Sequence, residues 1–200
     1  MTDARIFAPA AARNAAAVVE AMRDLAPATG EALEIASGSG EHAVAIAAAL
    51  PGLTWRPTDI QPDRLASIDA WAAHEGLATI APAAALNAVT ERWTGAPVDL
   101  TFAANILHLI DEASARAVVE TMAAALKPGG RFMTYGPFLR ADGFASDGDR
   151  AFDARLKIEN PGGGYKLVET VEDWMRAAGL GDLARREMPA NNLILHGIKA

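Results

Sequence analysis

Residues 32–51 read ALEIASGSGEHAVAIAAALP, a short apolar run followed by Ser37-Gly38-Ser39-Gly40 and then by an alanine-rich run. The first run predicts a buried strand, and the alanine-rich run predicts a helix entered from Gly40. A glycine loop between a strand and a helix lets the backbone approach a ligand closely, and the helix N-terminus offers free N–H groups. The stretch therefore predicts a ligand site at the carboxyl end of a central strand.

Strand and helix patterns alternate along the rest of the chain. Helical spacing of apolar residues covers residues 10–26, 41–50, 62–75, 111–126 and 168–178, and strand-like runs cover residues 33–36, 53–58, 78–87, 98–104, 131–136, 183–188 and 192–198. Repeated strand, helix and strand units fold as a parallel sheet with helices on both faces, which is an α/β architecture. The final two strands are separated by only a few residues around Pro189, so they must pair as an antiparallel hairpin. We therefore predict a doubly wound, mostly parallel sheet with one antiparallel strand.

Two segments depart from this regular pattern. Residues 78–87 contain Pro82, which cannot donate a hydrogen bond to a strand ladder, so this strand is expected at the edge of the sheet. Residues 137–165 are rich in glycine, and a loop-rich insertion of this length is more often a lid or a substrate-binding segment than a linker. The 200 residues are expected to form a single domain over residues 1–200, with an N-terminal helix at about residues 10–26.

Composition and charge exclude several classes of function. The formal net charge is −7, from 25 acidic and 18 basic residues, and no basic run is longer than Arg185-Arg186. This balance disfavours a nucleic acid or an anionic membrane as a partner. The absence of cysteine excludes disulfides and thiolate chemistry. The N-terminus lacks the unbroken apolar core of a signal peptide, and the longest apolar stretch, residues 43–50, is too short to span a bilayer. We expect a soluble, cytoplasmic protein without a metal site, because the histidines are too scattered to be ligands.

The glycine loop alone is compatible with two cofactors. Residues 38–43 (GSGEHA) satisfy G-x-G-x-x-A, the dinucleotide fingerprint, and Asp59 follows about twenty residues later to hold a ribose. A tight turn without a ligand also fits this short pattern. The preceding residues favour a different cofactor, because residues 34–40 (EIASGSG) place an acid before three small residues at alternate positions. This is similar to the first motif of class I S-adenosylmethionine-dependent methyltransferases. That motif usually has glycine in place of Ala36, a replacement that costs little unless the backbone there needs a positive φ.

The resemblance recurs further along the chain, in the order in which that family has its motifs. Residues 58–60 (TDI) resemble the second motif, in which the acid binds both ribose hydroxyls and the next apolar residue packs on adenine. Asn87 falls where the family often has an aspartate facing the adenine amino group, a hydrogen bond that asparagine can still accept. Residues 99–108 (DLTFAANILH) resemble the fourth-strand motif of small-molecule methyltransferases, and residues 126–130 (LKPGG) resemble the turn after its helix. The resemblance implies a cofactor site formed by Glu34, Ala36, Ser37, Gly38, Gly40, Asp59, Ile60, Asn87 and Asn105.

Two further motifs resemble a narrower, uncharacterised family of methyltransferase-like proteins. They are S-G-S-G-x-H at residues 37–42 and M-P-A-N-N at residues 188–192. The resemblance implies a Rossmann-like, seven-stranded sheet with strand order 3-2-1-4-5-7-6, which again places the strand containing Pro82 at the edge. It also implies S-adenosylmethionine as the cofactor and S-adenosylhomocysteine as the product, but it names no reaction.

Three residues are candidates for the catalytic chemistry. Methyl transfer is an in-line displacement, so the protein must mainly align the acceptor with the methyl group, and a base is needed only when the acceptor holds its proton. Asn105 and His108 follow the fourth strand, and Tyr135 lies at the end of the fifth. Each also has a structural interpretation: Asn105 as a capping turn, His108 as a packed side chain, and Tyr135 as a strand aromatic with a satisfied hydroxyl.

The predicted substrate pocket consists of polar residues near the expected methyl group: Arg13, Asn14, His108, Tyr135, Asn191 and Asn192. Arg13 and Asn14 lie on an otherwise apolar helix and either reach the site or face solvent. Asn191-Asn192 is either a pocket pair or an ordinary turn. The first functional prediction is a methyltransferase that uses S-adenosylmethionine on a small-molecule acceptor. The alternatives are an NAD(P)-dependent oxidoreductase, favoured by G-x-G-x-x-A, and an S-adenosylmethionine-binding protein without catalysis.

Overall fold

A seven-stranded sheet forms the centre of the computed structural model, which describes residues 3–200. Its strands are β1 (Gly30–Ile35), β2 (Leu53–Asp59), β3 (Ala84–Ala85), β4 (Val98–Ala104), β5 (Leu126–Pro137), β6 (Leu180–Glu187) and β7 (Asn192–Lys199). They are ordered β3-β2-β1-β4-β5-β7-β6. β7 is antiparallel to both neighbours, and the other neighbouring pairs are parallel. The predicted α/β fold, strand order and single antiparallel strand are confirmed.

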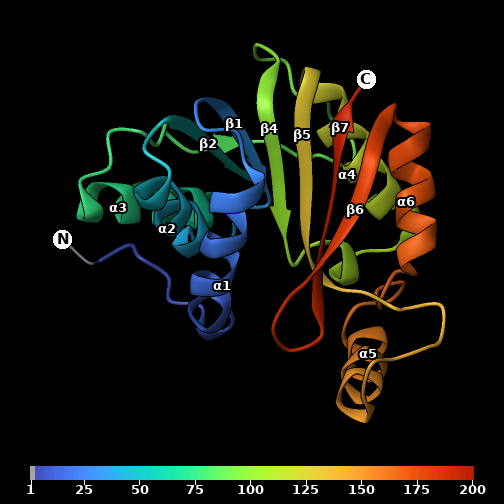
Figure 1. Ribbon diagram of the computed structural model, residues 1–200. Coiled ribbons are helices and arrows are strands. Elements are labelled where there is room, and N and C mark those ends of the chain that lie inside the picture. The colour runs from blue at the N-terminus through green and yellow to red at the C-terminus, as the bar shows by residue number, and fades with distance from the viewer. Residues whose placement is uncertain (1–2) are drawn as a thin grey trace.

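Helices cover both faces of this sheet (Figure 1). On one face lie α1 (Pro9–Leu25), α2 (Glu41–Ala49) and α3 (Pro62–Glu75), and on the other lie α4 (Glu112–Ala125) and α6 (Val168–Ala177). Alternate side chains of β1 contribute to both cores: Leu33 and Ile35 belong to the cluster with α4 and α6, and Ala32 to the cluster with α1 and α2. A parallel sheet buried on both faces explains why its strands are apolar without alternation. No helix within residues 3–200 has the length and apolar character needed to cross a membrane.

The helices begin and end at the residues that local chemistry favours. α3 begins at Pro62, where a missing N–H leaves no hydrogen bond unmade, and it ends at Gly76 with φ of 65°. Asp111 caps α4 as predicted, because its Oδ1 accepts a hydrogen bond from the backbone N–H of Ser114 at 2.9 Å. Between β4 and α4, the short 3-10 helix η1 (Leu107–Leu109) carries His108.

The strand expected over residues 78–87 is much shorter than predicted. β3 consists of Ala84–Ala85 alone, although a separate bridge joins Ile80 to Trp55 of β2. Pro82 lies between these two pairings and has no N–H to continue the ladder. The predicted position at the sheet edge is confirmed, because β3 pairs only with β2.

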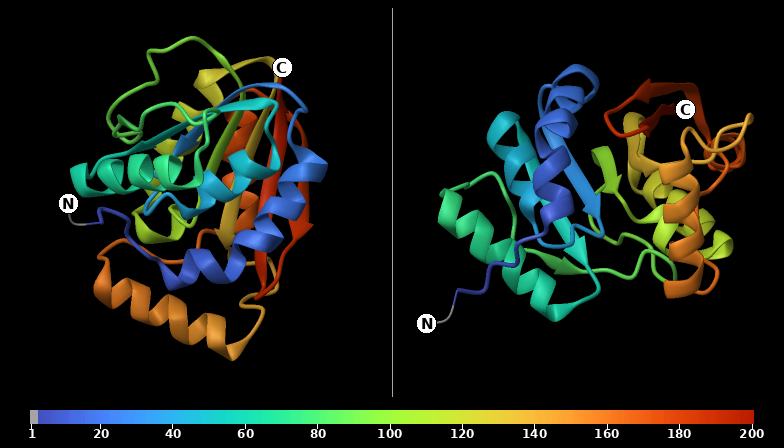
Figure 2. Two further views of the ribbon diagram at one scale, coloured as in Figure 1. Left: turned by 90° about the vertical axis from the view of Figure 1, so that its left-hand side faces the viewer. Right: turned by 90° about the horizontal axis from the view of Figure 1, so that it is seen from below.

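Residues 137–165 contain a helix that the sequence analysis missed. α5 (Asp147–Glu159) begins after Ser146, whose Oγ accepts from the backbone N–H of Asp149 at 3.1 Å. α5 buries only Asp153 and Leu156, so the apolar periodicity of its sequence is too weak to mark it as a helix. It lies beyond the ends of β4 and β5, below the sheet in Figure 1 and in front of it in the right-hand view of Figure 2. The segment predicted as a loop-rich insertion therefore contains one helix, with loops on both sides of it.

Candidate functional site

A cavity of about 360 Å³ opens at the carboxyl ends of β1, β2 and β4, where the strand order reverses. It is lined by Ala8, Ala10 and Ala11 from the N-terminal side, by residues 34–39 and His42 around the glycine loop, by residues 59–61 and Arg64 after β2, by residues 86–89, and by residues 104–106, Leu109, Ile110 and Val118 on the far side. All predicted cofactor-site residues except Gly40 line this cavity. The topology therefore brings together segments that are far apart in the sequence.

Hydrogen bonds donated by backbone N–H groups hold the glycine loop against the end of β2. The Gly38 N–H donates to Asp59 Oδ2 at 2.9 Å, and the Gln61 N–H donates to Asp59 Oδ1 at 3.0 Å. The Thr58 N–H donates to Ser37 Oγ at 3.1 Å, and the Ser37 N–H donates to the Thr58 carbonyl at 2.8 Å. The Asp59 carboxylate is thereby fixed in the cavity wall, where its remaining lone pairs can accept hydrogen bonds from a ligand.

Two residues of the motif have backbone requirements that the sequence left open. Ala36 has φ of 55°, so the departure from glycine places a side chain in a left-handed conformation. Gly40 has φ of 95°, and a Cβ there would lie 2.9 Å from the Cα of Ile68. Glycine at position 40 is therefore required for the close approach of α2 to α3, which explains why it does not line the cavity.

Glu34 is a buried carboxylate in the cavity wall. Its Oε2 accepts a hydrogen bond from Trp55 Nε1 at 2.8 Å. Burial raises the pKa of Glu34 to about 7, and the charge of Asp59 acts in the same direction, while hydrogen bonds from Trp55 and Ser37 oppose the shift. Glu34 can consequently gain or lose a proton near neutral pH, and a cationic ligand in the cavity would favour its ionised form.

The other end of the cavity is apolar. Ile60 and Leu109 line it with 62 % and 40 % of their surfaces exposed, and Leu86, Ile106 and Val118 complete the apolar wall. Asn87 lies beside them, but its Oδ1 already accepts from the Val89 N–H at 3.1 Å. A flat ring between Ile60 and this wall would be held by apolar contacts, with one polar edge towards Asn87.

His42 lines the cavity but is not among the predicted site residues, although it belongs to the S-G-S-G-x-H motif. Its Nε2 lies 2.6 Å from Asn14 Oδ1, and since that oxygen can only accept, Nε2 carries the proton. Neither Asn14 nor Tyr135, both predicted to line the substrate pocket, lines the cavity itself. Burial lowers the pKa of His42, so its imidazole is neutral at pH 7.

His108 lies next to Asn105 and the main chain of Gly136. A Cβ on Gly136 would be 3.6 Å from His108 Nδ1 and 3.8 Å from Asn105 Oδ1. His108 is 6 % exposed, and its ring faces those of Phe152 and Tyr165, with centroids 6.2 and 6.4 Å away. Burial, with the nearby charge of Lys166, lowers the pKa of His108 to about 4. Among residues 3–200, no side chain or backbone group hydrogen-bonds to this ring. The neutral imidazole of His108, next to Asn105, can therefore still accept a proton.

None of the six predicted substrate-pocket residues lines this cavity. Arg13 is exposed on α1. Asn191 Nδ2 donates to Asp149 Oδ2 of α5 at 2.9 Å, and Asn192 Nδ2 donates to the Pro189 carbonyl at 3.1 Å. The asparagines turn away because Ala190 and Asn191 both have left-handed backbones in the tight β6–β7 turn. The side chains of Arg13, Asn191 and Asn192 lie away from this cavity, which contains the unpredicted Arg64.

The left-handed backbone of Ala36 leads to a stability prediction. Ala36→Gly should raise the free energy of unfolding by up to about 1 kcal/mol, because glycine removes a strain of about 1–2 kcal/mol while making the unfolded chain more flexible. Gly38→Ala is the matched control, since Gly38 has φ of 60° and an added Cβ would touch only Arg64 Nη1 at 3.4 Å. It should lower the free energy of unfolding by about 1 kcal/mol. Urea denaturation measures both, and a destabilised Ala36→Gly variant would contradict the prediction.

The buried Glu34 leads to a prediction about pH. The pKa of Glu34 is about 7 in the folded protein and 4.5 without perturbation, so the folded state retains a proton that the unfolded state releases. Stability from this group is therefore full below about pH 4.5 and declines as the pH rises to 7. Relative to Glu34→Gln, the wild type should lose on the order of 3 kcal/mol across this range. Parallel stability curves for the two proteins between pH 5 and 8 would refute this assignment.

Solved structures share this fold across nearly the whole chain. An O-methyltransferase family protein from Burkholderia thailandensis has a TM-score of 0.81 at 19 % identity, covering 92 % of this chain and 55 % of that one. An O-methyltransferase family 2 protein from Planctomyces limnophilus, in complex with apigenin, has a TM-score of 0.81 at 20 % identity, covering 96 % and 58 %. Human N-acetylserotonin methyltransferase in complex with SAM has a TM-score of 0.76 at 17 % identity, covering 96 % and 53 %. At these identities the likeness shows a common fold.

The chain spans little more than half the length of these solved proteins. A sequence profile for a family described as "Protein of unknown function (DUF938)" matches residues 5–199. This match covers both the glycine loop and the β6–β7 hairpin. The chain therefore belongs to the DUF938 family of proteins of unknown function.

Proposed function

We propose that this protein transfers the methyl group of S-adenosylmethionine to a hydroxyl of a small molecule. The observation that supports this proposal most directly is the cavity at the place where the strand order reverses. In this cavity the Asp59 carboxylate accepts hydrogen bonds from two backbone N–H groups and lies between the glycine loop and the apolar wall. Asp59 would accept from the ribose hydroxyls, and Ile60 would pack on the adenine. The resemblance of the glycine loop and the common fold support the same assignment.

The cavity residues fit this cofactor chemically. Gly38 presents no side chain towards the cavity, so the backbone can approach the methionine portion. Glu34 and Asp59 supply acidic groups in the wall, which suit a ligand carrying an ammonium and a sulfonium. Asn105, with its left-handed backbone at the end of β4, directs its side chain towards Gly136. When bound, the cofactor supplies a methyl group activated by its attachment to a sulfonium.

His108 would act as the general base for the acceptor. Its ring is neutral at physiological pH and has no hydrogen-bond partner within residues 3–200, so a ring nitrogen can take the proton of an acceptor hydroxyl. Phe152 and Tyr165 beside it would exclude water and contact the acceptor. The apigenin complex of the Planctomyces limnophilus protein supports a small-molecule acceptor. The formal charge of −7 further disfavours a polyanionic acceptor.

The cofactor is tested by thermal unfolding with S-adenosylhomocysteine, S-adenosylmethionine and NAD, each in excess. A ligand at a hundred times its dissociation constant adds about 2.7 kcal/mol to the folded state, which raises the midpoint by several degrees. We expect both adenosyl sulfur compounds to raise the midpoint and NAD to leave it unchanged. Asp59→Asn should weaken S-adenosylhomocysteine binding about tenfold or more, since it loses charged hydrogen bonds to the ribose. A shift with NAD alone would favour the oxidoreductase, because G-x-G-x-x-A and Asp59 also fit a dinucleotide.

The base is tested with an acceptor found by screening phenols and other small hydroxyl compounds for methyl turnover. Wild-type kcat should stay level above about pH 5 and fall as the pH approaches 4, where His108 becomes protonated. His108→Gln should lower kcat about 100-fold or more, without changing the affinity for S-adenosylhomocysteine. An unchanged kcat in this variant would remove His108 from the mechanism. A protein that binds the cofactor but methylates no acceptor would point to the non-catalytic alternative.

A further inference from the structure

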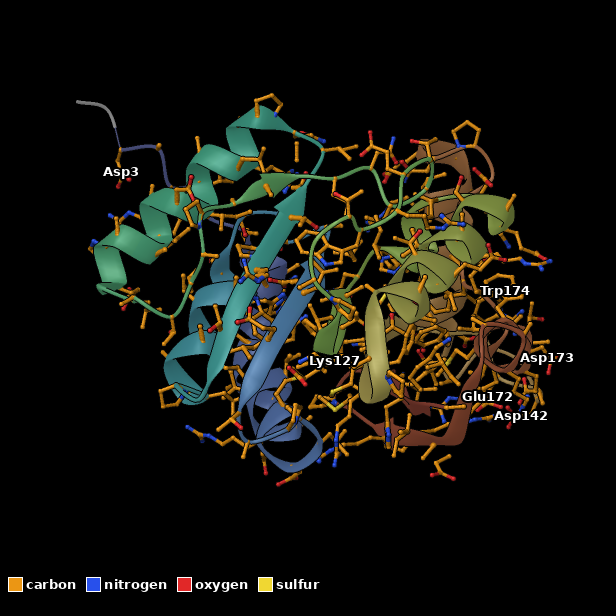
Figure 3. All side chains as sticks on the ribbon, turned by 90° about the horizontal axis from the view of Figure 1, so that it is seen from above. Asp3, Lys127, Asp142, Glu172, Asp173 and Trp174 are labelled. Atoms are coloured by element: carbon orange, nitrogen blue, oxygen red, sulfur yellow. The ribbon has the colours of Figure 1, made fainter. Side chains whose placement is uncertain are left out.

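The residues before α1 form an extended segment, residues 3–8, which we call the N-terminal strap. It lies beside α3, beyond which Asp3 is seen in Figure 3. Trp71 of α3 donates from Nε1 to the Ile6 carbonyl at 3.1 Å. The Phe7 ring contacts Trp71 edge to face at 5.0 Å, and the Arg5 guanidinium lies 4.9 Å from the centre of the Trp71 ring. The strap thus follows α3 towards the cavity, where Ala8 forms part of the wall.

Two side chains connect the strap to the same residue of the glycine loop. Glu41 Oε2 accepts from the Ala8 N–H at 2.7 Å and from Ser39 Oγ at 2.8 Å. Ser67 Oγ accepts from the Ile6 N–H at 2.8 Å and donates to the Ser39 carbonyl at 2.7 Å. The hydroxyl and the carbonyl of Ser39 are therefore each joined to the strap through one bridging side chain.

These bridges link two walls of the proposed cofactor cavity. Ala8, Ala10 and Ala11 line it from the side of the strap and α1, and Ser39 lines it from the glycine loop. The strap has little apolar anchoring of its own, since Phe7 is 63 % exposed. A segment with few buried contacts opens easily, so its docking depends on the hydrogen bonds that it donates to Glu41 and Ser67 and on the one that it accepts from Trp71.

We propose that Glu41 and Ser67 are positioning residues of the cofactor site. By joining the strap to Ser39, they hold the N-terminal wall of the cavity against the glycine loop. A ligand that contacts both walls then stabilises the docked strap, and the docked strap strengthens binding by the same factor. This inference rests on the proposed function, because the ligand that contacts both walls is the cofactor or its product.

Binding affinity gives the first test, with S-adenosylhomocysteine titrated calorimetrically into the full chain. Loss of one net hydrogen bond of this kind corresponds to a change of roughly 3- to 10-fold. Ser67→Ala and Glu41→Ala should each weaken binding by about this factor. Glu41→Gln keeps a carbonyl oxygen that can accept from Ala8, so it should recover part of the affinity. The glutamine variant also guards against a loss that reflects only poor folding of the alanine variant.

Amide hydrogen exchange distinguishes positioning from a local structural role. In the wild type, S-adenosylhomocysteine should slow exchange at the Ile6 and Ala8 amides by a factor similar to the loss of affinity in the variants. In Ser67→Ala, the protection should fall at the Ala8 amide too, although Ala8 bonds to Glu41 and not to Ser67. A side chain with only a local role would change exchange at its own partner, Ile6, and leave Ala8 unaffected.

Lys127→Met is the matched control for a general loss of stability. Lys127 Nζ lies 2.9 Å from Asp99 Oδ2, and Figure 3, which views the edge of the sheet opposite to the cavity, shows Lys127 there. This variant should lose stability without changing the affinity for S-adenosylhomocysteine. If the wild type binds S-adenosylhomocysteine and the Glu41 and Ser67 variants bind it equally well, the positioning role is overturned and the proposed function stands. If the wild type does not bind it, both fail.

Discussion

The hydrogen bond between the Gly38 N–H and the Asp59 carboxylate fixes the geometry of the whole site. It holds the loop after β1 against the end of β2, so that the backbone of the loop and the carboxylate face one cavity. Parallel pairing of β1 with both β2 and β4 places all three carboxyl ends at the same edge. Because the order of the strands reverses at β1, the loops there diverge to opposite faces and leave space between them.

Burial shifts three titratable groups in or near this space towards their neutral forms. The pKa of Glu34 is raised, and the pKa values of His42 and His108 are lowered. The shared cause is desolvation, which disfavours a charge of either sign. Neutral histidines do not repel a cationic ligand, and a neutral imidazole is able to accept a proton.

The two ends of the site are built differently. The proposed cofactor end uses backbone groups of rigid strand termini and one loop, which the packing of α2 against α3 at Gly40 holds in place. The end near His108 uses η1, α5 and the β6–β7 hairpin, joined by polar contacts such as that of Asn191 with Asp149. Side chains on such connections change more readily than strand ends, so acceptor recognition can differ among proteins that share the fold.

The sequence by itself determined the order of strands and helices, the hairpin at Pro189 and the loop carrying Gly38, because period, turn chemistry and glycine placement are local. It also placed Asp59, Ile60 and Asn105 at strand ends, where the topology brings them together. Only the tertiary structure decided that α5 is a helix, because the helix buries only Asp153 and Leu156 and its apolar face is too small to mark it in the sequence. Only the tertiary structure showed that His42 and Arg64 lie in the cavity wall and that the side chains of Arg13, Asn191 and Asn192 lie away from it. The direction of a side chain on a helix or in a turn depends on what packs beside it, and spacing along the chain does not encode that.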